Sequence, residues 1–320
     1  MRLIFCGTPL FAVPTLKHLL ARTNFQVIGA ITQPDRPRGR GQEVSFSPVK
    51  ETAIAAGIPV HQPEKIRAPE VDELLRQLVP DVIVIIAYGQ IIPARLLTIP
   101  KLGWINLHAS LLPKYRGAAP INWAIVHGET RTGVTTMRID AGMDTGEILL
   151  QEELEIRPSE TAPELAARMS ELGAPLMAET LRGLASASIV PHVQAHADAS
   201  NAPMLKKDDG RIDWSRTARE IFNRMRGFAP WPGAYTSFRG QSCHIWGEPA
   251  SNELRGPGVE GALGGDPGSL LVQRNEVMVR CGGTTQLRLL AVKLDGRKRV
   301  SGAEFVNGAR LLSGERFGQA

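Results

Sequence analysis

Asn106, His108 and Asp144 are the residues of this chain whose types and spacing could do chemistry. The first two lie in residues 103–113, and the third lies in residues 140–146. A carboxamide can donate a hydrogen bond to a carbonyl oxygen that becomes negative under attack. An imidazole and a carboxylate can move the proton that an attacking amine must lose. The set therefore predicts acyl transfer to nitrogen.

Each of these residues also has an ordinary interpretation when it is taken alone. A lone histidine after a strand is most often a hydrogen-bonded part of the scaffold, and Asp-x-Gly loops are common turns. Their placement favours chemistry, because His108 follows Asn106 by two residues and both side chains then project from one face of a strand. Ser110 continues this alternation if the strand extends. Glycines on both sides of Asp144 permit a sharp turn that could aim it inward.

The segments that must position these residues alternate between strands and helices. Apolar, β-branched runs predict strands at residues 2–6, 26–32, 81–87, 104–108, 133–139 and 148–156. Helical spacing predicts helices at residues 11–21, 120–127 and 159–184. This order predicts a doubly wound, mostly parallel Rossmann-like α/β sheet. Such sheets bind ligands beyond the carboxyl ends of their strands. The strands at 81–87 and 104–108 are expected to be neighbours and to end at this edge.

The composition changes at residues 185–205, where Ala, Ser, His and Pro dominate without any periodicity. This segment predicts a linker between a catalytic domain at residues 1–184 and a second domain at residues 206–320. The second domain has one predicted helix, at residues 217–227. It also has five short strand candidates, at residues 234–238, 242–246, 269–273, 277–281 and 286–293, which predict a small β-barrel.

The net charge of +5 is unevenly distributed along the chain. Residues 206–320 carry 18 Lys and Arg against 12 Asp and Glu, whereas residues 1–205 carry 19 against 20. This asymmetry indicates a polyanionic partner, with solvated surface as the alternative. Arg36, Arg38 and Arg40 alternate along a glycine-containing loop, and arginine forks match phosphate oxygens. A plain solvated loop is again the alternative.

Several classes of site and location are not expected. The first strand is not followed by G-x-G-x-x-G, and no P-loop motif occurs, so no nucleotide cofactor is predicted. His192 and His196 are four residues apart, but they lie in the linker segment, and we expect no metal site. The odd count of three cysteines, the lack of a signal-peptide pattern and the lack of an apolar run near ~20 residues favour a cytoplasmic protein outside the membrane.

Several motifs resemble the methionyl-tRNA formyltransferase family. They are INLHASLLPKYRGAAPI at residues 105–121, FCGTP at 5–9, TQPDRP at 32–37, MDTG at 143–146, and DW at 213–214 with GFAPWPGAY at 227–235. The match runs essentially from end to end. The motif around Asn106 is by itself shared by formyltransferases that use 10-formyltetrahydrofolate.

The resemblance implies transfer of the formyl group of 10-formyltetrahydrofolate to the α-amino group of methionine on initiator tRNA. Asn106, His108 and Asp144 fall on the catalytic positions of the family. We hypothesise direct attack without a covalent enzyme intermediate. Asn106 and protonated His108 would stabilise the oxyanion, and His108 could protonate N10 of the leaving folate. Asp144 would hold the imidazole and accept the proton of the amine.

The resemblance also implies binding residues. Folate contacts are expected from Ala87, Tyr88, Gly89, Gln90, Ile91, Ser110, Leu111, Leu112, Pro113 and Asp140. The pterin should meet backbone groups of residues 87–93 and of the loop 140–144. Contacts to tRNA are expected from Arg36, Arg38, Arg40, Lys206 and Lys207, with the loop 34–50 against the acceptor stem. The OB-like carboxyl-terminal domain would hold the tRNA. We expect a monomer.

Two other functions fit the same residues. A formyltransferase that acts on a small amine, such as glycinamide ribonucleotide or an amino-sugar nucleotide, would share the three site residues. The arginine loop and the basic last third of the chain argue against it. A catalytically silent RNA-binding protein on the same scaffold would not need the three residues. A formyl-transfer assay distinguishes these functions.

Overall fold

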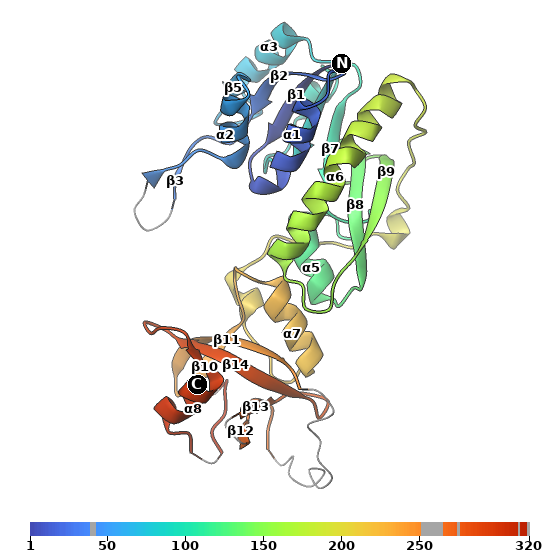
Figure 1. Ribbon diagram of the computed structural model, residues 1–320. Coiled ribbons are helices and arrows are strands. Elements are labelled where there is room, and N and C mark those ends of the chain that lie inside the picture. The colour runs from blue at the N-terminus through green and yellow to red at the C-terminus, as the bar shows by residue number, and fades with distance from the viewer. Residues whose placement is uncertain (39–42, 251–264, 274–275, 313, 319–320) are drawn as a thin grey trace. The chain divides into compact units, whose positions relative to one another are not determined.

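The computed structural model describes residues 1–38, 43–250, 265–273, 276–312 and 314–318 (Figure 1). The chain divides into two compact units. Unit 1 consists of Met1–Pro120, Arg131–Ile156 and Glu164–Pro203. Unit 2 consists of Ile121–Thr130, Arg157–Pro163 and Met204–Ala320. Residues 185–203, where the composition suggests a linker, belong to unit 1.

Unit 1 is built on a seven-stranded sheet. The strands, in their order across the sheet, are β5 (Val60–His61), β2 (Gln26–Ile31), β1 (Arg2–Gly7), β6 (Val82–Ile86), β7 (Trp104–His108), β8 (Arg131–Arg138) and β9 (Ile148–Glu155). The pairs from β5 to β7 are parallel, and those between β7, β8 and β9 are antiparallel. The predicted mostly parallel, Rossmann-like sheet is confirmed, and β6 and β7 are neighbours as expected.

Helices cover the sheet of unit 1. They are α1 (Val13–Leu20), α2 (Pro48–Ala55), α3 (Pro69–Leu78), α4 (Ala94–Leu97) and α6 (Ala162–Ala185), with the short 3₁₀ helices η1 (Leu10–Ala12) and η2 (His196–Asp198). All five residues of β6 are buried, which explains its unbroken apolar sequence. A short hairpin pairs β3 (Pro37–Arg38) with β4 (Glu43–Val44).

Helix α6 covers one face of the sheet at β7 and β8. A Cβ atom on Gly173 of α6 would lie 2.4 Å from Leu107 Cδ2 of β7, so the helix packs closely on this strand (Figure 1). Thr180 of α6 is also 2.8 Å from Thr136 of β8, between hydroxyl oxygens. Because successive side chains alternate across a strand, Asn106 and His108 project from the face opposite Leu107.

Unit 2 combines helices with a second, antiparallel sheet. Its helical elements are α5 (Pro120–Val126), which begins at the end of unit 1, η3 (Lys207–Gly210), α7 (Ala218–Gly227) and α8 (Gly302–Ala309). The strand order is β10 (Tyr235–Phe238), β11 (Gln241–Pro249), β14 (Gln286–Leu294), β13 (Glu276–Arg280) and β12 (Leu270–Gln273), and β15 (Val300–Ser301) also pairs with β14. The five predicted strands are present, and the sheet fits the predicted class. In the described residues it does not close, since β10 and β12 remain its edges.

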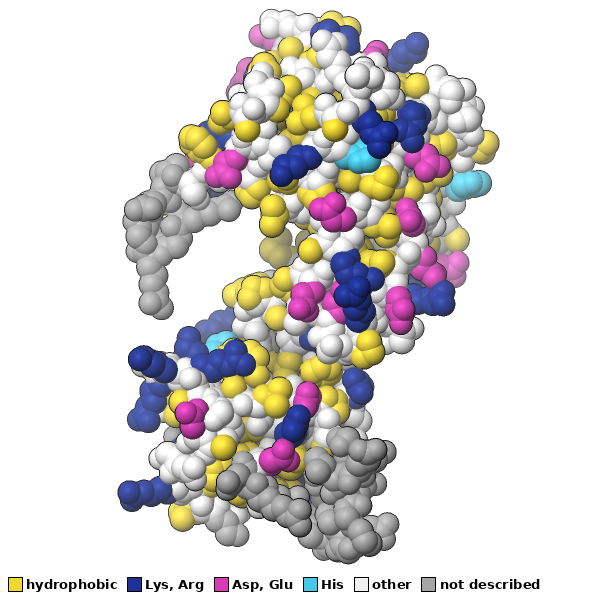
Figure 2. Space-filling view, in the orientation of Figure 1, with side chains coloured by type: hydrophobic (Ala, Val, Ile, Leu, Met, Phe, Trp, Pro, Cys, Tyr) yellow, Lys and Arg dark blue, Asp and Glu magenta, His cyan; other side chains and the backbone are white. Residues whose placement is uncertain are grey.

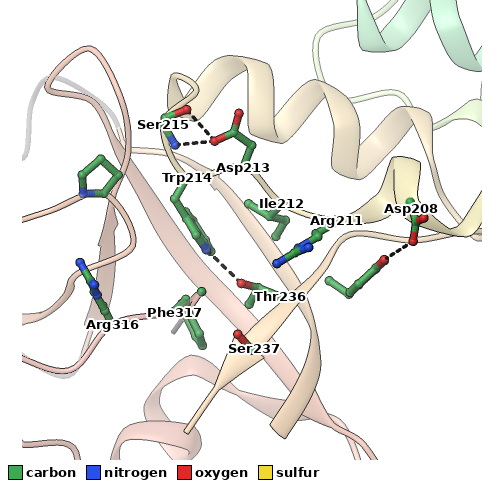
Figure 3. A pocket seen from close by; sticks show the side chains of 13 residues that line it. Asp208, Arg211, Ile212, Asp213, Trp214, Ser215, Thr236, Ser237, Arg316 and Phe317 are labelled. Atoms are coloured by element: carbon green, nitrogen blue, oxygen red, sulfur yellow. Dashed lines mark hydrogen bonds between the residues drawn. The ribbon is translucent and has the colours of Figure 1, made fainter. Parts of the chain in front are cut away.

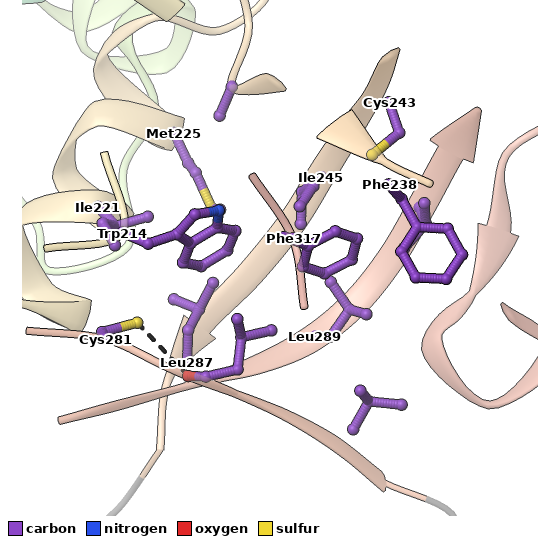
Figure 4. Close-up of a cluster of buried hydrophobic side chains, with 14 of the residues drawn as sticks. Trp214, Ile221, Met225, Phe238, Cys243, Ile245, Cys281, Leu287, Leu289 and Phe317 are labelled. Atoms are coloured by element: carbon purple, nitrogen blue, oxygen red, sulfur yellow. Dashed lines mark hydrogen bonds between the residues drawn. The ribbon is translucent and has the colours of Figure 1, made fainter. Parts of the chain in front are cut away.

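The core of unit 2 is rich in aromatic side chains (Figure 4). Trp214 and Phe317 stack with their ring centroids 5.7 Å apart. Cys243 and Cys281 lie in the same core as free thiols, and burial raises the pKa of each to about 12. Both therefore stay protonated near neutral pH, as expected of buried structural cysteines.

No helix in the described residues combines the length and the apolar character that crossing a membrane requires.

Candidate active site

The candidate site begins at the carboxyl end of β7. Asn106 is half-buried and lies between Ile85 of β6 and Met137 of β8 in the register of the sheet. Within the described part of the chain, the Asn106 carboxamide has no hydrogen-bond partner. Its N–H groups are therefore available to an oxygen brought to this edge of the sheet. His108, two residues on, shares the same face and is buried.

The imidazole of His108 is fixed by one ring nitrogen. Its Nε2 is 2.9 Å from the backbone oxygen of Tyr115. A carbonyl oxygen can only accept, so Nε2 carries the proton and donates it. The other nitrogen, Nδ1, is 3.6 Å from Asp144 Oδ2. Nδ1, beside the carboxylate, is therefore the ring nitrogen that is not held by a backbone carbonyl.

Asp144 reaches this position through an unusual backbone conformation. Its φ is +53°, in the left-handed region that side chains other than glycine rarely adopt. Gly117 donates its backbone N–H to Asp144 Oδ2 at 2.8 Å. Gly146 is required for a different reason, since a Cβ there would lie 1.9 Å from Arg138 O. The turn expected between the two flanking glycines is present, and its positive φ angle falls on Asp144 itself.

The loop that contains Asp144 is also organised by Asp140. The Asp140 carboxylate accepts from the backbone N–H of Gly142 at 3.0 Å and from the hydroxyl of Thr145 at 2.8 and 2.9 Å. Both partners lie in the same loop, so this exposed carboxylate stabilises the turn. Asp140 was expected near the folate, and its observed hydrogen bonds shape the loop around Asp144.

The loop after His108 is fixed to the antiparallel strands β8 and β9. Thr135 of β8 donates its hydroxyl to Ser110 O at 2.6 Å and accepts from Leu112 N at 3.1 Å. Gln151 of β9 donates to Leu112 O at 2.9 Å. The Ser110 side chain is fully buried and donates to Lys114 O at 2.6 Å. β7 ends at His108, so Ser110 shapes the loop and does not extend the strand alternation. Leu112 is buried, whereas Leu111 and Pro113 are half-buried.

The loop after β6 offers backbone groups at the neighbouring strand end. Ala87 and Gly89 are exposed and have positive φ values of 48° and 86°, and Ile91 is 81% exposed. Tyr88 is buried, and its carbonyl accepts from Gln33 Nε2 at 2.8 Å. Gln90 donates to Gln33 Oε1 at 3.2 Å and accepts from Ile66 N at 2.8 Å. These bonds hold the loop while its outer backbone stays accessible.

The arginine loop has an ordered base. Lys50 donates to Asp35 Oδ2 and to Gln62 Oε1, and Gln62 donates to Asp35 Oδ1 at 3.0 Å. The hydrogen bond from Lys50 holds the pKa of Asp35 below its ordinary value. Arg36, which follows this base, is exposed. The side chain of Arg38 and the whole of Arg40 lie outside the described residues.

No role at the site was predicted for three residues that help to form it. Tyr115 contributes its carbonyl and Gly117 its N–H, and both stand in the KYRGAAP stretch that follows the predicted loop. Their positions in that motif are the sequence feature that could have indicated a role at the site. Gln194 reaches the backbone of Asp144 with its side-chain amide at 2.9 Å. No sequence pattern marks Gln194, because it lies in a segment without periodicity.

Unit 2 contains a separate pocket with a volume of about 680 Å³ (Figure 3). Trp214 and Thr236 meet there through a 3.1 Å hydrogen bond, and the Tyr235 hydroxyl is 3.4 Å from Asp208. Arg316, on the same wall, pairs with Asp266. None of the residues that line this pocket belongs to the Asn106, His108 and Asp144 set, and three of its charged side chains, Asp208, Asp213 and Arg316, have partners within unit 2. This pocket is therefore separate from the candidate site at the strand ends of unit 1.

Basic side chains are prominent on unit 2. Figure 2 shows Lys and Arg side chains gathered along one edge of this unit, in keeping with the excess of 18 basic over 12 acidic residues at 206–320. Lys206 and Lys207 are exposed at the start of η3.

The described residues contain no group of three or more His, Cys, Asp or Glu side chains placed to hold a metal ion.

Comparisons with known proteins agree along the whole chain. Residues 1–181 match the formyl transferase family, and residues 204–310 match the formyl transferase C-terminal domain. The methionyl-tRNA formyltransferase of Solibacter usitatus (strain Ellin6076) is 52% identical over 319 residues, covering 100% of this chain and 99% of the relative. That of Koribacter versatilis (strain Ellin345) is 49% identical over 320 residues, with 100% and 99% covered.

A solved structure shares the fold. WlaRD, a sugar 3N-formyl transferase crystallised in the presence of dTDP and 5-N-formyl-THF, superposes with a TM-score of 0.64. Its sequence is 19% identical, and the match covers 93% of this chain and 99% of that one. At this identity the likeness concerns the fold alone.

Proposed function

Because the chain belongs to the formyl transferase family, and within it to the methionyl-tRNA formyltransferases, we propose that it formylates methionine on initiator tRNA. The formyl donor is 10-formyltetrahydrofolate, and the acceptor is the α-amino group of the methionine. One observation carries the proposal. Asn106, which has no hydrogen-bond partner in the described residues, shares a strand face with His108, and Nδ1 of His108 lies 3.6 Å from Asp144 Oδ2.

The reaction follows from this geometry. The amine nitrogen attacks the formyl carbon, and a tetrahedral intermediate forms with its negative charge on oxygen. Asn106 donates to that oxygen, and protonated His108 stabilises the same charge. The bond between the formyl carbon and N10 then breaks, N10 takes a proton from His108 Nδ1, and Asp144 accepts the proton that the amine loses. Formylmethionyl-tRNA and tetrahydrofolate leave, and the enzyme regains its starting protonation state when Asp144 returns a proton to Nδ1.

The folate would lie at the ends of β6 and β7. The accessible backbone of Ala87, Gly89 and Ile91 supports binding of a flat heterocycle by fixed polar groups between apolar walls. Leu111 and Pro113, half-buried in the loop after His108, would supply part of the apolar wall. The loop from Asp140 to Asp144 would close the opposite side.

The tRNA would be held by basic residues of both units. Arg36, Arg38 and Arg40 would neutralise phosphates of the acceptor stem, and exposed Lys206 and Lys207 would add contacts from unit 2. The basic balance of residues 206–320 supports this assignment. We place the enzyme, as a monomer, in the cytoplasm, where its tRNA substrate is used for translation initiation.

A substrate panel tests the proposal. The protein is mixed with 10-formyltetrahydrofolate and, separately, methionine-charged initiator tRNA, methionine-charged elongator tRNA or glycinamide ribonucleotide. We expect formyl transfer to the initiator tRNA alone. Transfer to glycinamide ribonucleotide would instead favour the small-amine formyltransferase, and the absence of transfer to any acceptor would overturn the assignment as an enzyme.

A further inference from the structure

Gln194 is a buried amide between two loops of the candidate site. Its side chain is 3% exposed, although it lies in the irregular segment that follows α6. Its Nε2 donates to Asp144 O at 2.9 Å and to Gly146 O at 2.7 Å. Its Oε1 accepts from Arg116 Nε at 3.0 Å and from Arg116 Nη2 at 2.6 Å. Both N–H groups and the oxygen of the amide are therefore satisfied within the protein.

The two loops that Gln194 joins are the ones that hold His108 and Asp144. On the donor side, it binds the backbone of Asp144 itself. On the acceptor side, it binds Arg116, which stands between Tyr115 and Gly117. Tyr115 O accepts from His108 Nε2, and Gly117 N donates to the Asp144 carboxylate. One side chain thus connects the backbone supports of both groups.

The segment around Gln194 is fixed to unit 1 by its own backbone. His192 exchanges two backbone hydrogen bonds with Ile148 of β9, each of 2.8 Å. Further along, Arg116 N donates to Ser200 O at 2.8 Å, and Ala202 N donates to Arg116 O at 2.7 Å. Gln194 is therefore held from both sides and can act as a rigid support.

Asp144 needs such a support because its backbone is in the left-handed region. At φ +53°, the residue would relax to a more common conformation if its anchors were removed. Relaxation would rotate the carboxylate away from His108 Nδ1, now 3.6 Å from it. The hydrogen bonds of Gln194 to Asp144 O and Gly146 O hold the peptide groups on either side of this turn.

We propose that Gln194 is a positioning residue for the Asp144–His108 pair. This inference rests on the proposed formyl transfer and extends its machinery into the segment after α6. Gln194 itself contacts neither substrate. Its amide sets where the carboxylate stands relative to the imidazole, and so it acts on the chemical step and leaves substrate binding largely unchanged.

Two variants with a matched control test the proposal in the full-length protein. Gln194→Met keeps the side-chain length and removes all four hydrogen bonds, whereas Gln194→Glu keeps the acceptor for Arg116 and loses both N–H groups. We expect each to lower kcat at least about tenfold, since small misplacements of catalytic groups cost up to about 10² in rate. KM for 10-formyltetrahydrofolate should stay within about threefold. The control Thr180→Val removes two buried hydrogen bonds of α6, to Thr136 and to Leu176 O, and should keep wild-type kcat.

The outcomes separate this inference from the function on which it rests. Wild-type protein that forms no formylated tRNA would overturn the proposed function. Active wild-type protein, with a folded Gln194→Met variant of equal kcat, would overturn the role of Gln194 alone. An equal fall of kcat in Thr180→Val would assign the effect to general destabilisation and also overturn it. If Gln194→Met does not fold, Arg116→Met, which releases the amide from the acceptor side only, is measured by the same criteria.

Discussion

Gly117 donates its backbone N–H to the carboxylate of Asp144 at 2.8 Å, across 27 positions of the chain. The glycine has φ +117°, and a Cβ there would lie 2.7 Å from Ala202 O, so no other residue fits without a shift of the backbone. The loop that follows β7 thus holds Asp144, the acid that lies beside His108 at the end of β7. A backbone donor orients this acid without competing for the proton on the imidazole.

Asn106→Ala should lower kcat for formyl transfer by about 10²–10³, because it removes one donor to the oxyanion. KM for 10-formyltetrahydrofolate should change by only a few fold, since the amide acts mainly on the tetrahedral intermediate. Steady-state kinetics with charged initiator tRNA measure both constants. Asn24→Ala, in an exposed turn of unit 1, serves as the control and should match the wild type. Wild-type turnover in Asn106→Ala would remove the oxyanion assignment.

His108→Ala should lose at least as much kcat, because the variant lacks both charge stabilisation and the proton donor for N10. Binding of the folate, measured by equilibrium fluorescence titration, should remain within a few fold. His18→Ala, in α1 away from the site, tests whether loss of any histidine has this effect. A variant His108→Ala that turns over like wild type would show that the imidazole is scaffold.

Arg40→Ala should reduce kcat/KM for the tRNA and leave KM for the folate unchanged. Each phosphate contact releases counterions, so the slope of log KM for tRNA against log salt should also fall by about one charge. Arg22→Ala, at an exposed position after α1, removes the same charge and serves as the control. Identical tRNA kinetics for Arg40→Ala and wild type would contradict the assigned tRNA contact and favour a plain solvated loop.

Arg226→Met should destabilise unit 2 by about 1.5–3 kcal/mol, the usual contribution of hydrogen bonds to a charged group. Arg226 is 7% exposed, and its guanidinium donates to Arg157 O, Glu160 O and Asn223 Oδ1. Denaturant unfolding followed by circular dichroism gives the loss. Arg219→Met, at an exposed position of the same helix, should cost far less, and equal losses would contradict a specific role for the buried guanidinium.

Asp35→Asn should destabilise the protein at neutral pH but not in acid. The hydrogen bond from Lys50 holds the pKa of Asp35 below its ordinary 3.8. The ionised carboxylate therefore contributes stability that is fully present above pH 3.8 and is lost as the pH falls through the lowered value. The difference in unfolding free energy between wild type and Asp35→Asn should shrink on acidification through this window. A difference independent of pH would contradict the linkage.

Much of the fold was predictable because it depends on local patterns. The apolar run of β6 indicated a strand buried on both faces, and Thr217 with Glu220 forms the capping box at the start of α7, near its predicted first residue. The helices α2, α3, α4 and α8 and the strands β3, β4, β5 and β15 were not predicted. The four strands are two residues long, and none of the four helices exceeds ten residues, so neither their period nor their length indicated them.

The sequence by itself indicated the candidate catalytic groups. It also placed Asn106 and His108 on one strand face, since that follows from the two-residue period of any strand. Only the tertiary structure decided how the imidazole is held and where the acid stands. Tyr115, Gly117 and Gln194 act through backbone and amide hydrogen bonds between segments up to 78 positions apart. Such contacts leave no local periodicity, because they are set by how the loops pack once the sheet has formed.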